Sequence, residues 1–239
     1  MGKKPLSSRK PVNAVYADDD YMVFEKPPGL LTIAGDGESG VSLTEIVNDQ
    51  HAQAGGASLH PCHRLDRETS GLIIFAKGKS RQQKMMAVFH ENAVYKRYIA
   101  FVQGRPEKDH GELRKSIRKP ARDKFSAGGP GKPAVTKFRV VARHKDFSVL
   151  EVEPQTGRTN QIRIHLAGYG HPIVGERRFA FAKDFTVKFK RVALHAAGLK
   201  FTQPVTGKVI ELNSPLPEDM SQFLAQHPIK GAKGARNFK

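Results

Sequence analysis

The stretch HRLDRETSGLIIFAKG, which runs from His63 to Gly78, decides how the rest of the sequence is interpreted. It places Asp66 between Arg64 and Arg67, ahead of a glycine and an apolar run. Nearby guanidinium groups favour the charged form of a carboxyl, so Asp66 is expected to be ionised at neutral pH. An ionised carboxylate suits a nucleophile or an electrostatic stabiliser better than a proton donor. Taken alone, however, such a segment is more often a surface loop with local ion pairs.

Length and composition limit the class of protein. The 239 residues are enough to bury a substantial core, as one large domain or as two small lobes. The sequence has no apolar run long enough for a membrane span, and its basic N-terminus has no apolar segment typical of a secretory signal. Cys62 is the single cysteine, which excludes a disulfide framework. We therefore expect a cytoplasmic protein that does not contact membranes.

Net charge is the strongest global indication of a partner. Lys and Arg number 40 against 23 Asp and Glu, which gives a formal charge of +17. Such an excess attracts polyanions, because phosphate neutralisation releases counterions from a nucleic acid. Two stretches concentrate the cations, residues 115–137 and 177–191. RNA is the favoured partner, and the alternative is a generally basic, solvated surface. Arg118, Arg122 and Lys124 in the first stretch are candidate contacts to the RNA backbone.

The hydrophobic pattern mixes strands and helices. Strands are expected at 21–26, 72–76, 95–103, 136–143, 147–153, 193–202 and 207–212, with a hairpin joining 136–143 to 147–153. Ser42 and Glu45 have capping-box spacing and predict a helix to about residue 52. A second helix is expected over 80–92, with Ser80 as its N-cap. The mixture indicates an α+β protein with a largely antiparallel sheet.

A second dense segment, QTGRTNQIRIHLAGYGHPIVGE, runs from Gln155 to Glu176. A turn at its start should lead into a short helix over about 160–167, although alternation of Gln161, Arg163 and His165 also fits a strand. Core packing with solvated arginines is the simpler interpretation of this segment alone.

The usual cofactor and metal motifs are absent from the sequence. It has no P-loop and no G-x-G-x-x-G motif, so we expect no nucleotide cofactor. No HExxH spacing occurs, and His60, Cys62 and His63 lack a convincing fourth zinc ligand. We therefore expect neither a metal nor a cofactor.

Four blocks in order resemble the RluA-type RNA pseudouridine synthases. The segment at 63–78 resembles the family's H-R-L-D-x-x-T-S-G pattern, and VYADDDYMVFEKPPGLLT at 15–32 resembles its opening strand and K-P-x-G-L turn. YKRYIAFVQG at 95–104 and the block ending at Glu176 also match, as does a closing LHAAGLKFTQPVTGK. Two positions depart from the pattern: Asn160 stands where the family usually has His, and Glu176 where it usually has Asp.

The resemblance implies both a fold and a reaction. It implies the pseudouridine synthase catalytic fold over residues 13–226, a mixed, mostly antiparallel sheet with flanking helices and a central RNA-binding cleft. Basic flexible tails are expected at 1–12 and 227–239, and no separate N-terminal RNA-binding domain is expected. The enzyme would be an isomerase that flips a uridine out of RNA and rejoins its sugar to carbon 5 of the base. We expect a monomer whose substrate is large-subunit ribosomal RNA or transfer RNA.

Roles for individual residues follow from the resemblance. Asp66 would be the nucleophile or would stabilise a glycal-like intermediate, and Arg163 would pair with it. Tyr98 would stack on the target base, since a reference pKa of about 10 makes tyrosine a poor base. The substrate-binding candidates are Arg64, which would fill the gap left by the flipped base, Ile162 in the base pocket, Arg158 and His63.

Two other functions would also fit part of the sequence. A non-catalytic RNA-binding or ribosome-assembly protein with the same fold would explain the charge, but it would not require Asp66, Tyr98 and Arg163 together. A glycosidase-like enzyme would need a second carboxylate at a defined separation from Asp66. Glu68 is its only acidic sequence neighbour and belongs to no second acid motif.

Overall fold

The computed structural model describes residues 11–35, 40–118, 131–181 and 185–229. These residues form two compact units, one from Met1–Val94 with Ala196–Ser214 and one from Tyr95–His195 with Pro215–Lys239. Both units combine antiparallel strands with helices, so the predicted α+β class is confirmed. Among the described residues, no helix has the length and apolar character needed to cross a membrane.

The first unit is built on a sheet in which β4 is the apolar run of the segment quoted above. Its strands lie in the order β1, β2, β4, β9, with β10 paired to β9 and β3 paired to β4. Their bounds are β1 Ala14–Ala17, β2 Tyr21–Lys26, β3 Leu59–Pro61, β4 Ser70–Lys77, β9 Leu194–Thr202 and β10 Val209–Asn213. The expected strands at 21–26 and 72–76 are thus confirmed, and β1 and β3 are additions.

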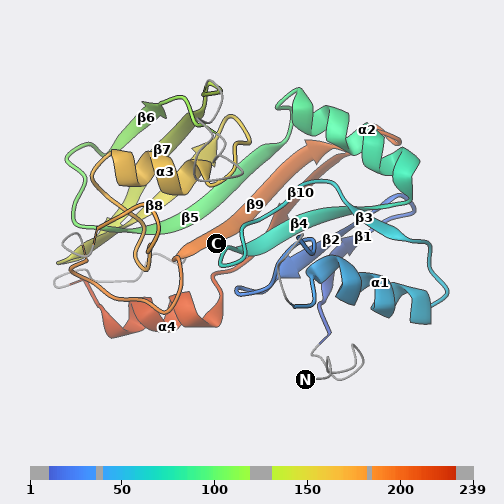
Figure 1. Ribbon diagram of the computed structural model, residues 1–239, viewed down its shortest axis with the longest axis horizontal. Helices are drawn as coiled ribbons and strands as arrows, with labels where there is room; N and C mark the ends of the chain where they lie inside the picture. The colour runs from blue at the N-terminus through green and yellow to red at the C-terminus, as the bar shows by residue number, and fades with distance from the viewer. Residues whose placement is uncertain (1–10, 36–39, 119–130, 182–184, 230–239) are drawn as a thin grey trace, which may run out of the picture. The chain divides into compact units, whose positions relative to one another are not determined.

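Two helices pack on this sheet, α1 (Leu43–Gln53) against β3 and α2 (Lys79–His90) against β3 and β4 (Figure 1). The capping box at Ser42 is confirmed, since its side chain accepts from the Glu45 N–H and the Glu45 carboxylate accepts from the Ser42 N–H. The predicted cap at Ser80 is wrong. The helix begins one residue earlier, and Gly78 occupies the N-cap at φ 94° without a side-chain hydrogen bond.

The core of the first unit lies between β4 and α2. Leu72, Ile74 and Ala76 alternate along β4 and pack with Met85 of α2 and with Phe201 of β9, and none of these five is more than 2% exposed. The odd-numbered residues are also buried, and the Phe75 ring meets the Phe24 ring edge-on at 5.5 Å. Since both faces of β4 are covered, its sequence is a continuous apolar run rather than an alternating one.

The second unit has the strand order β5, β8, β7, β6. These strands are β5 Tyr95–Gln103, β6 His110–Arg114, β7 Val135–Arg143 and β8 Phe147–Pro154. The helices are α3 Gln161–Gly168 and α4 Glu218–Gln226. The hairpin of β7 and β8 and the helix at α3 are confirmed, whereas β6 and α4 were not expected from the sequence.

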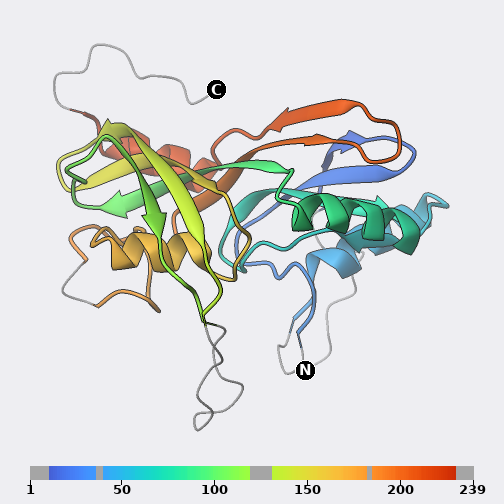
Figure 2. The same ribbon diagram turned by 90° about the horizontal axis from the view of Figure 1, so that it is seen from above.

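The two helices of the second unit lie on opposite faces of its sheet, as Figure 2 shows. Alternate side chains of a strand point to opposite faces. Phe147 contacts Phe223 of α4, whereas Phe138, which is paired with Val152, contacts Tyr169 at the end of α3. Even-numbered residues of β8 therefore face α3 and odd-numbered ones face α4.

Val12 and His227, at the inner ends of the two predicted tails, contact the folded part of the chain. Val12 is buried and its N–H donates to the Gln50 side chain at 3.2 Å. The His227 ring contacts Phe147 and Phe223. The remaining parts of both predicted tails, residues 1–10 and 230–239, lie outside the described residues.

Gly71 provides a test of how tightly β4 and β9 pack. It has φ +112°, and an added Cβ would lie 2.2 Å from the Ala196 carbonyl oxygen. Gly71→Ala should lower the free energy of unfolding by about 3 kcal/mol, combining backbone strain with overpacking. Gly207→Ala is the matched control, because Gly207 has φ +72° and open space around it. Urea unfolding should give a loss of about 1 kcal/mol for the control, and equal losses would contradict the close approach.

Candidate active site

Asp66 lies in the loop between β3 and β4 and is half-buried. The Thr69 N–H donates to the Asp66 carbonyl at 3.1 Å, which closes a tight turn around the carboxylate-bearing residue. Arg64 and Arg67 on either side are exposed. The loop therefore holds Asp66 in a fixed turn while its two arginine neighbours reach solvent.

Two side chains from the KPPGLLT segment hold the backbone on both sides of Asp66. Lys26 is 1% exposed, and its ammonium donates to the carbonyls of Pro27, Leu30 and Arg67 at 2.7–3.0 Å. The Thr32 hydroxyl donates to the Leu65 carbonyl at 3.0 Å and accepts from the Leu65 N–H at 3.2 Å. The backbone just before and just after Asp66 is thus fixed by hydrogen bonds from another part of the chain.

His63, predicted to bind substrate, makes contacts within the first unit. Its Nε2 accepts a hydrogen bond from the Ile74 N–H at 3.0 Å, so the ring is neutral with its proton on Nδ1. The ring also lies 4.6 Å from the ring of Phe89 in α2. These contacts connect the start of the Asp66 loop to β4 and α2, and a role in substrate binding stays a prediction.

The other two candidate catalytic residues, Tyr98 and Arg163, belong to the second unit. Tyr98 lies in β5 directly opposite Val152 of β8 and therefore points to the face covered by α3. It is half-buried at the more exposed end of β5. Arg163 lies on α3, which covers this same face. The register of the sheet thus places Tyr98 and Arg163 on one side of the second unit.

Arg163 is held in place by three side chains of its own unit. Its Nε and Nη2 donate to the two oxygens of Glu176 at 2.7 and 2.9 Å, and its Nη1 donates to Asn160 Oδ1 at 2.9 Å. The guanidinium carbon lies 5.1 Å from the centroid of the Phe179 ring. A forked ion pair with an aromatic ring beside it fixes both the position and the plane of a guanidinium.

Glu176 is itself fixed by the backbone. Its side chain is 0% exposed, and Oε1 also accepts from the N–H groups of Arg177, Arg178 and Phe179. Burial alone would raise the pKa of this carboxyl, but the hydrogen bonds from Arg163 and the backbone outweigh burial and lower the pKa below its usual value. Glu176 is therefore an ionised, buried anchor for Arg163.

The start of α3 is shaped by a network around Gln161, which is 4% exposed. Its amide oxygen accepts from the Thr156 hydroxyl and the Arg158 N–H, and its nitrogen donates to the Val135 carbonyl and the Thr136 hydroxyl. Asn160 adopts φ 55°, a left-handed conformation that Asn tolerates better than most residues. The network attaches the helix that carries Arg163 to β7.

The other predicted substrate contacts differ in exposure. Ile162 is 6% exposed, whereas Arg158 is exposed, with its Nε donating to the Pro133 carbonyl at 3.2 Å. Arg118 is exposed as well, and Arg122 and Lys124 lie outside the described residues. Asp66, Arg64 and His63 belong to the first unit, and Tyr98, Ile162, Arg163, Arg158 and Arg118 belong to the second.

Four residues that support the site were missed from the sequence: Lys26, Thr32, Gln161 and Glu176. Lys26 and Thr32 stood inside a quoted block, and Glu176 was noted only as a departure from a pattern. The sequence gives no signal for Glu176 beyond its place after Gly175, because only the structure shows that Gly175 has φ +85° and no room for a Cβ beside the Arg191 carbonyl.

Comparisons with known proteins agree with this architecture. Residues 20–168, more than half of the chain, match the family model for RNA pseudouridylate synthases. YlyB of Bacillus subtilis, named an uncharacterized RNA pseudouridine synthase, is 32% identical over 225 residues, which cover 92% of this chain and 74% of that protein. Ribosomal large subunit pseudouridine synthase D of Pasteurella multocida is 33% identical over 227 residues, covering 90% of this chain and 70% of the relative.

A solved structure is similar in fold. The human RNA pseudouridylate synthase domain containing 4 superposes with a TM-score of 0.75 at 22% identity, covering 89% of this chain and 92% of that one. Fold and family together define an RNA-modifying isomerase. The chain belongs to the RNA pseudouridylate synthase family, as the four sequence blocks indicated.

Glu176→Gln tests the anchoring of Arg163. At pH 7 it should lower the free energy of unfolding by about 3 kcal/mol, because it replaces the buried, ionised carboxylate that binds the Arg163 guanidinium through both oxygens with a neutral amide. The folded-state pKa of Glu176 lies below its ordinary value of 4.5. Its stabilisation is therefore fully present above pH 4.5 and is lost as the pH falls through the folded-state pKa.

The measurement is urea unfolding of both proteins from pH 7 to pH 3.5. The stability difference between wild type and Glu176→Gln should narrow at the acidic end. Glu176→Asp is the control, because it keeps the charge and should keep the pH dependence. A stability difference that stays constant over this pH range would show that the ionised carboxylate is not the anchor.

Proposed function

We propose that this pseudouridine synthase acts on large-subunit ribosomal RNA and that Asp66 is its catalytic carboxylate. The observation that carries the assignment is that hydrogen bonds from Lys26 and Thr32 fix the backbone on both sides of Asp66. A catalytic group has to be held to within a fraction of an ångström by its supports. The choice of RNA rests on the relative named as a ribosomal large subunit enzyme, with transfer RNA as the second candidate.

The proposed reaction needs no external reagent. The bond from carbon 1′ of the ribose to nitrogen 1 of uracil breaks, the base turns, and carbon 1′ bonds to carbon 5. The proton on carbon 5 is lost and nitrogen 1 gains one, so the product is an isomer of the substrate. In this scheme ionised Asp66 attacks as a nucleophile or stabilises a glycal-like intermediate.

The other residues bind and position the flipped nucleotide. Tyr98 stacks on the target base, and its location on the α3 face of the second unit supports this role. Arg64, exposed beside Asp66, fills the space that the flipped uridine leaves in the RNA. Base flipping costs a few kcal/mol, least where the RNA is already unpaired. Arg118, Arg122 and Lys124 add phosphate contacts in this proposal.

Arg163 pairs with Asp66 in this proposal and keeps the carboxylate ionised. The support for this role is the rigid placement of its guanidinium by Glu176, Asn160 and Phe179. A guanidinium held by a fork has its remaining N–H groups aimed in fixed directions. A cytoplasmic location and a monomeric state also belong to the proposal.

Asp66→Asn tests the carboxylate. The variant should form no detectable pseudouridine, whereas its affinity for RNA should stay within about twofold, because phosphate contacts dominate affinity. Pseudouridines would be mapped in ribosomal and transfer RNA from a strain that lacks the protein, before and after adding each variant. Glu68→Gln is the matched control in the same loop and should restore the modification. Full activity of Asp66→Asn would refute the assignment, and a restored site in transfer RNA alone would refute the substrate.

Arg163 is tested through the pH dependence of the rate. Removing the cation in Arg163→Ala should raise the Asp66 pKa by about one unit or more. The acidic limb of the pH–rate profile should therefore shift to higher pH. Arg163→Lys keeps the charge but not the fork, so its turnover should fall while the acidic limb stays near that of the wild type. An unshifted acidic limb in Arg163→Ala would exclude the ion pair.

A further inference from the structure

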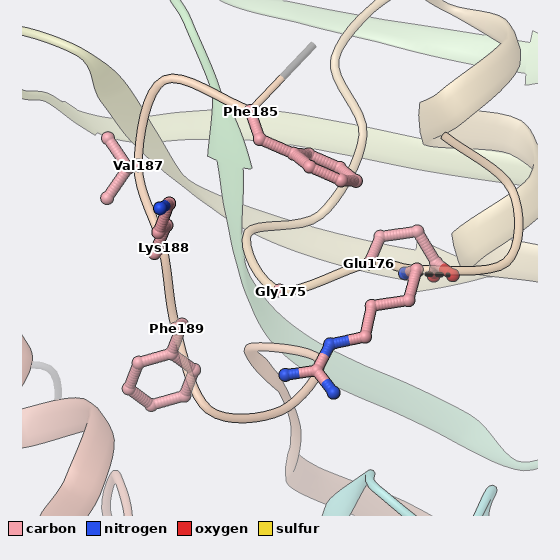
Figure 3. A pocket seen from close by; sticks show the side chains of 7 residues that line it. Gly175, Glu176, Phe185, Val187, Lys188 and Phe189 are labelled. Carbon is pink, nitrogen blue, oxygen red and sulfur yellow. Dashed lines mark hydrogen bonds between the residues drawn. The ribbon is translucent and has the colours of Figure 1, made fainter. Parts of the chain in front are cut away.

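A cavity of about 220 Å³ lies beside Glu176 in the second unit (Figure 3). It is lined by Gly175, Glu176 and Arg177 on one side and by Phe185 and residues 187–189 on the other. In the close-up the Phe185 ring points toward Glu176. The volume is below the usual range of drug-sized sites, so the cavity suits a single ring system.

The walls of this cavity are fixed by buried groups. Gln103, 4% exposed, accepts from the Thr186 hydroxyl and the Val187 N–H and donates to the Val187 carbonyl, all at 2.7–3.0 Å. The centroid of the Phe189 ring lies 5.7 Å from the guanidinium carbon of Arg191 and 5.2 Å from the centroid of the Phe223 ring. The chain that carries Phe185 and Lys188 is therefore attached to β5 and α4.

The chemistry of the lining selects a flat ring close to an anion. Phe185 and Phe189 provide aromatic surface, and Arg177 and Lys188 provide positive charge. Glu176 adds no accessible negative site, because both of its oxygens accept hydrogen bonds from Arg163 and the adjacent backbone. Aromatic rings among cations are the usual platform for the bases of single-stranded nucleic acid.

Glu176 connects this cavity to the proposed catalytic machinery. The same carboxylate lines the cavity and binds Arg163 through both oxygens. A base in the cavity would thus lie one side chain away from Arg163. We propose that the cavity binds one unpaired nucleobase of the substrate RNA, next to the target uridine, and contributes to the choice of site. The position next to the target rests on the proposed function.

The test compares lining residues with neighbours of the same type. Phe185 and Lys188 line the cavity, whereas Phe181, which is 75% exposed, and Lys190 belong to the same segment but not to the lining. Binding of a fluorescein-labelled 12-residue oligouridylate would be measured by anisotropy for Phe185→Ala, Phe185→Leu, Lys188→Ala, Phe181→Ala and Lys190→Ala. Phe185→Leu keeps apolar volume without an aromatic face, so it tests stacking if the alanine variant does not fold.

Both Phe185 variants should bind at least about fivefold more weakly, whereas Phe181→Ala should change the affinity less than twofold. The loss of affinity in the Phe185 variants should persist at high salt, because salt does not screen stacking. The loss of affinity in Lys188→Ala should shrink at high salt, because salt screens its charge. Equal losses for Phe181 and Phe185 would overturn the cavity in favour of a general basic-aromatic surface. If Lys188→Ala weakens oligouridylate binding and the Phe185 variants do not, the base site would be overturned in favour of a phosphate contact.

With the RNA that the mapping identifies, Phe185→Leu should raise KM about fivefold or more and leave kcat within about twofold, since stacking binds ground state and transition state alike. The two proposals fail separately. If Asp66→Asn is inactive but Phe185 and Phe181 variants bind alike, only the cavity proposal falls. If Asp66→Asn is active while Phe185→Leu weakens oligouridylate binding, the catalytic assignment falls and the base site stands.

Discussion

The forked ion pair between Arg163 and Glu176 is the interaction on which the candidate catalytic arginine of the second unit depends for its position. It fixes a guanidinium with two parallel hydrogen bonds at 2.7 and 2.9 Å, and the carboxylate is in turn fixed by three backbone N–H groups. A Lys at position 163 could not reproduce this geometry, because an ammonium is a point charge. Through Glu176 the same interaction also forms a wall of the neighbouring cavity.

The two departures from the family pattern meet at this guanidinium. Asn160 precedes α3 and Glu176 follows it within the same segment, and both accept hydrogen bonds from Arg163. Glu reaches one methylene further than the usual Asp, and Asn is shorter than the usual His. A change in side-chain length at one position therefore alters the distance that the side chain at the other position must span to bind Arg163. We interpret the two departures as one local arrangement around an unchanged arginine rather than as separate losses.

Sequence patterns predicted the elements with strong periodicity or capping signals, such as α1 with its box at Ser42 and the hairpin of β7 and β8. They failed at the start of α2, where Gly78 rather than Ser80 is the N-cap, and at α4, whose Phe223 packs on Phe101 and Phe147 from distant parts of the sequence. Candidate catalytic residues could be taken from motifs. Their supports could not, because Lys26 and Gln161 act through backbone groups that sequence does not bring together.

Both units use a buried ion to position a functional segment. Lys26 binds three carbonyls beside the Asp66 loop, and Glu176 binds three N–H groups beside Arg163. Moving such ions out of water costs several kcal/mol each, and apolar replacements are often as stable. A contribution to stability alone is therefore a weak explanation for the presence of either buried ion. Their common property is that charged groups bind several dipoles strongly at short range. That is what a loop needs if its carboxylate or guanidinium is to stay in place when RNA binds.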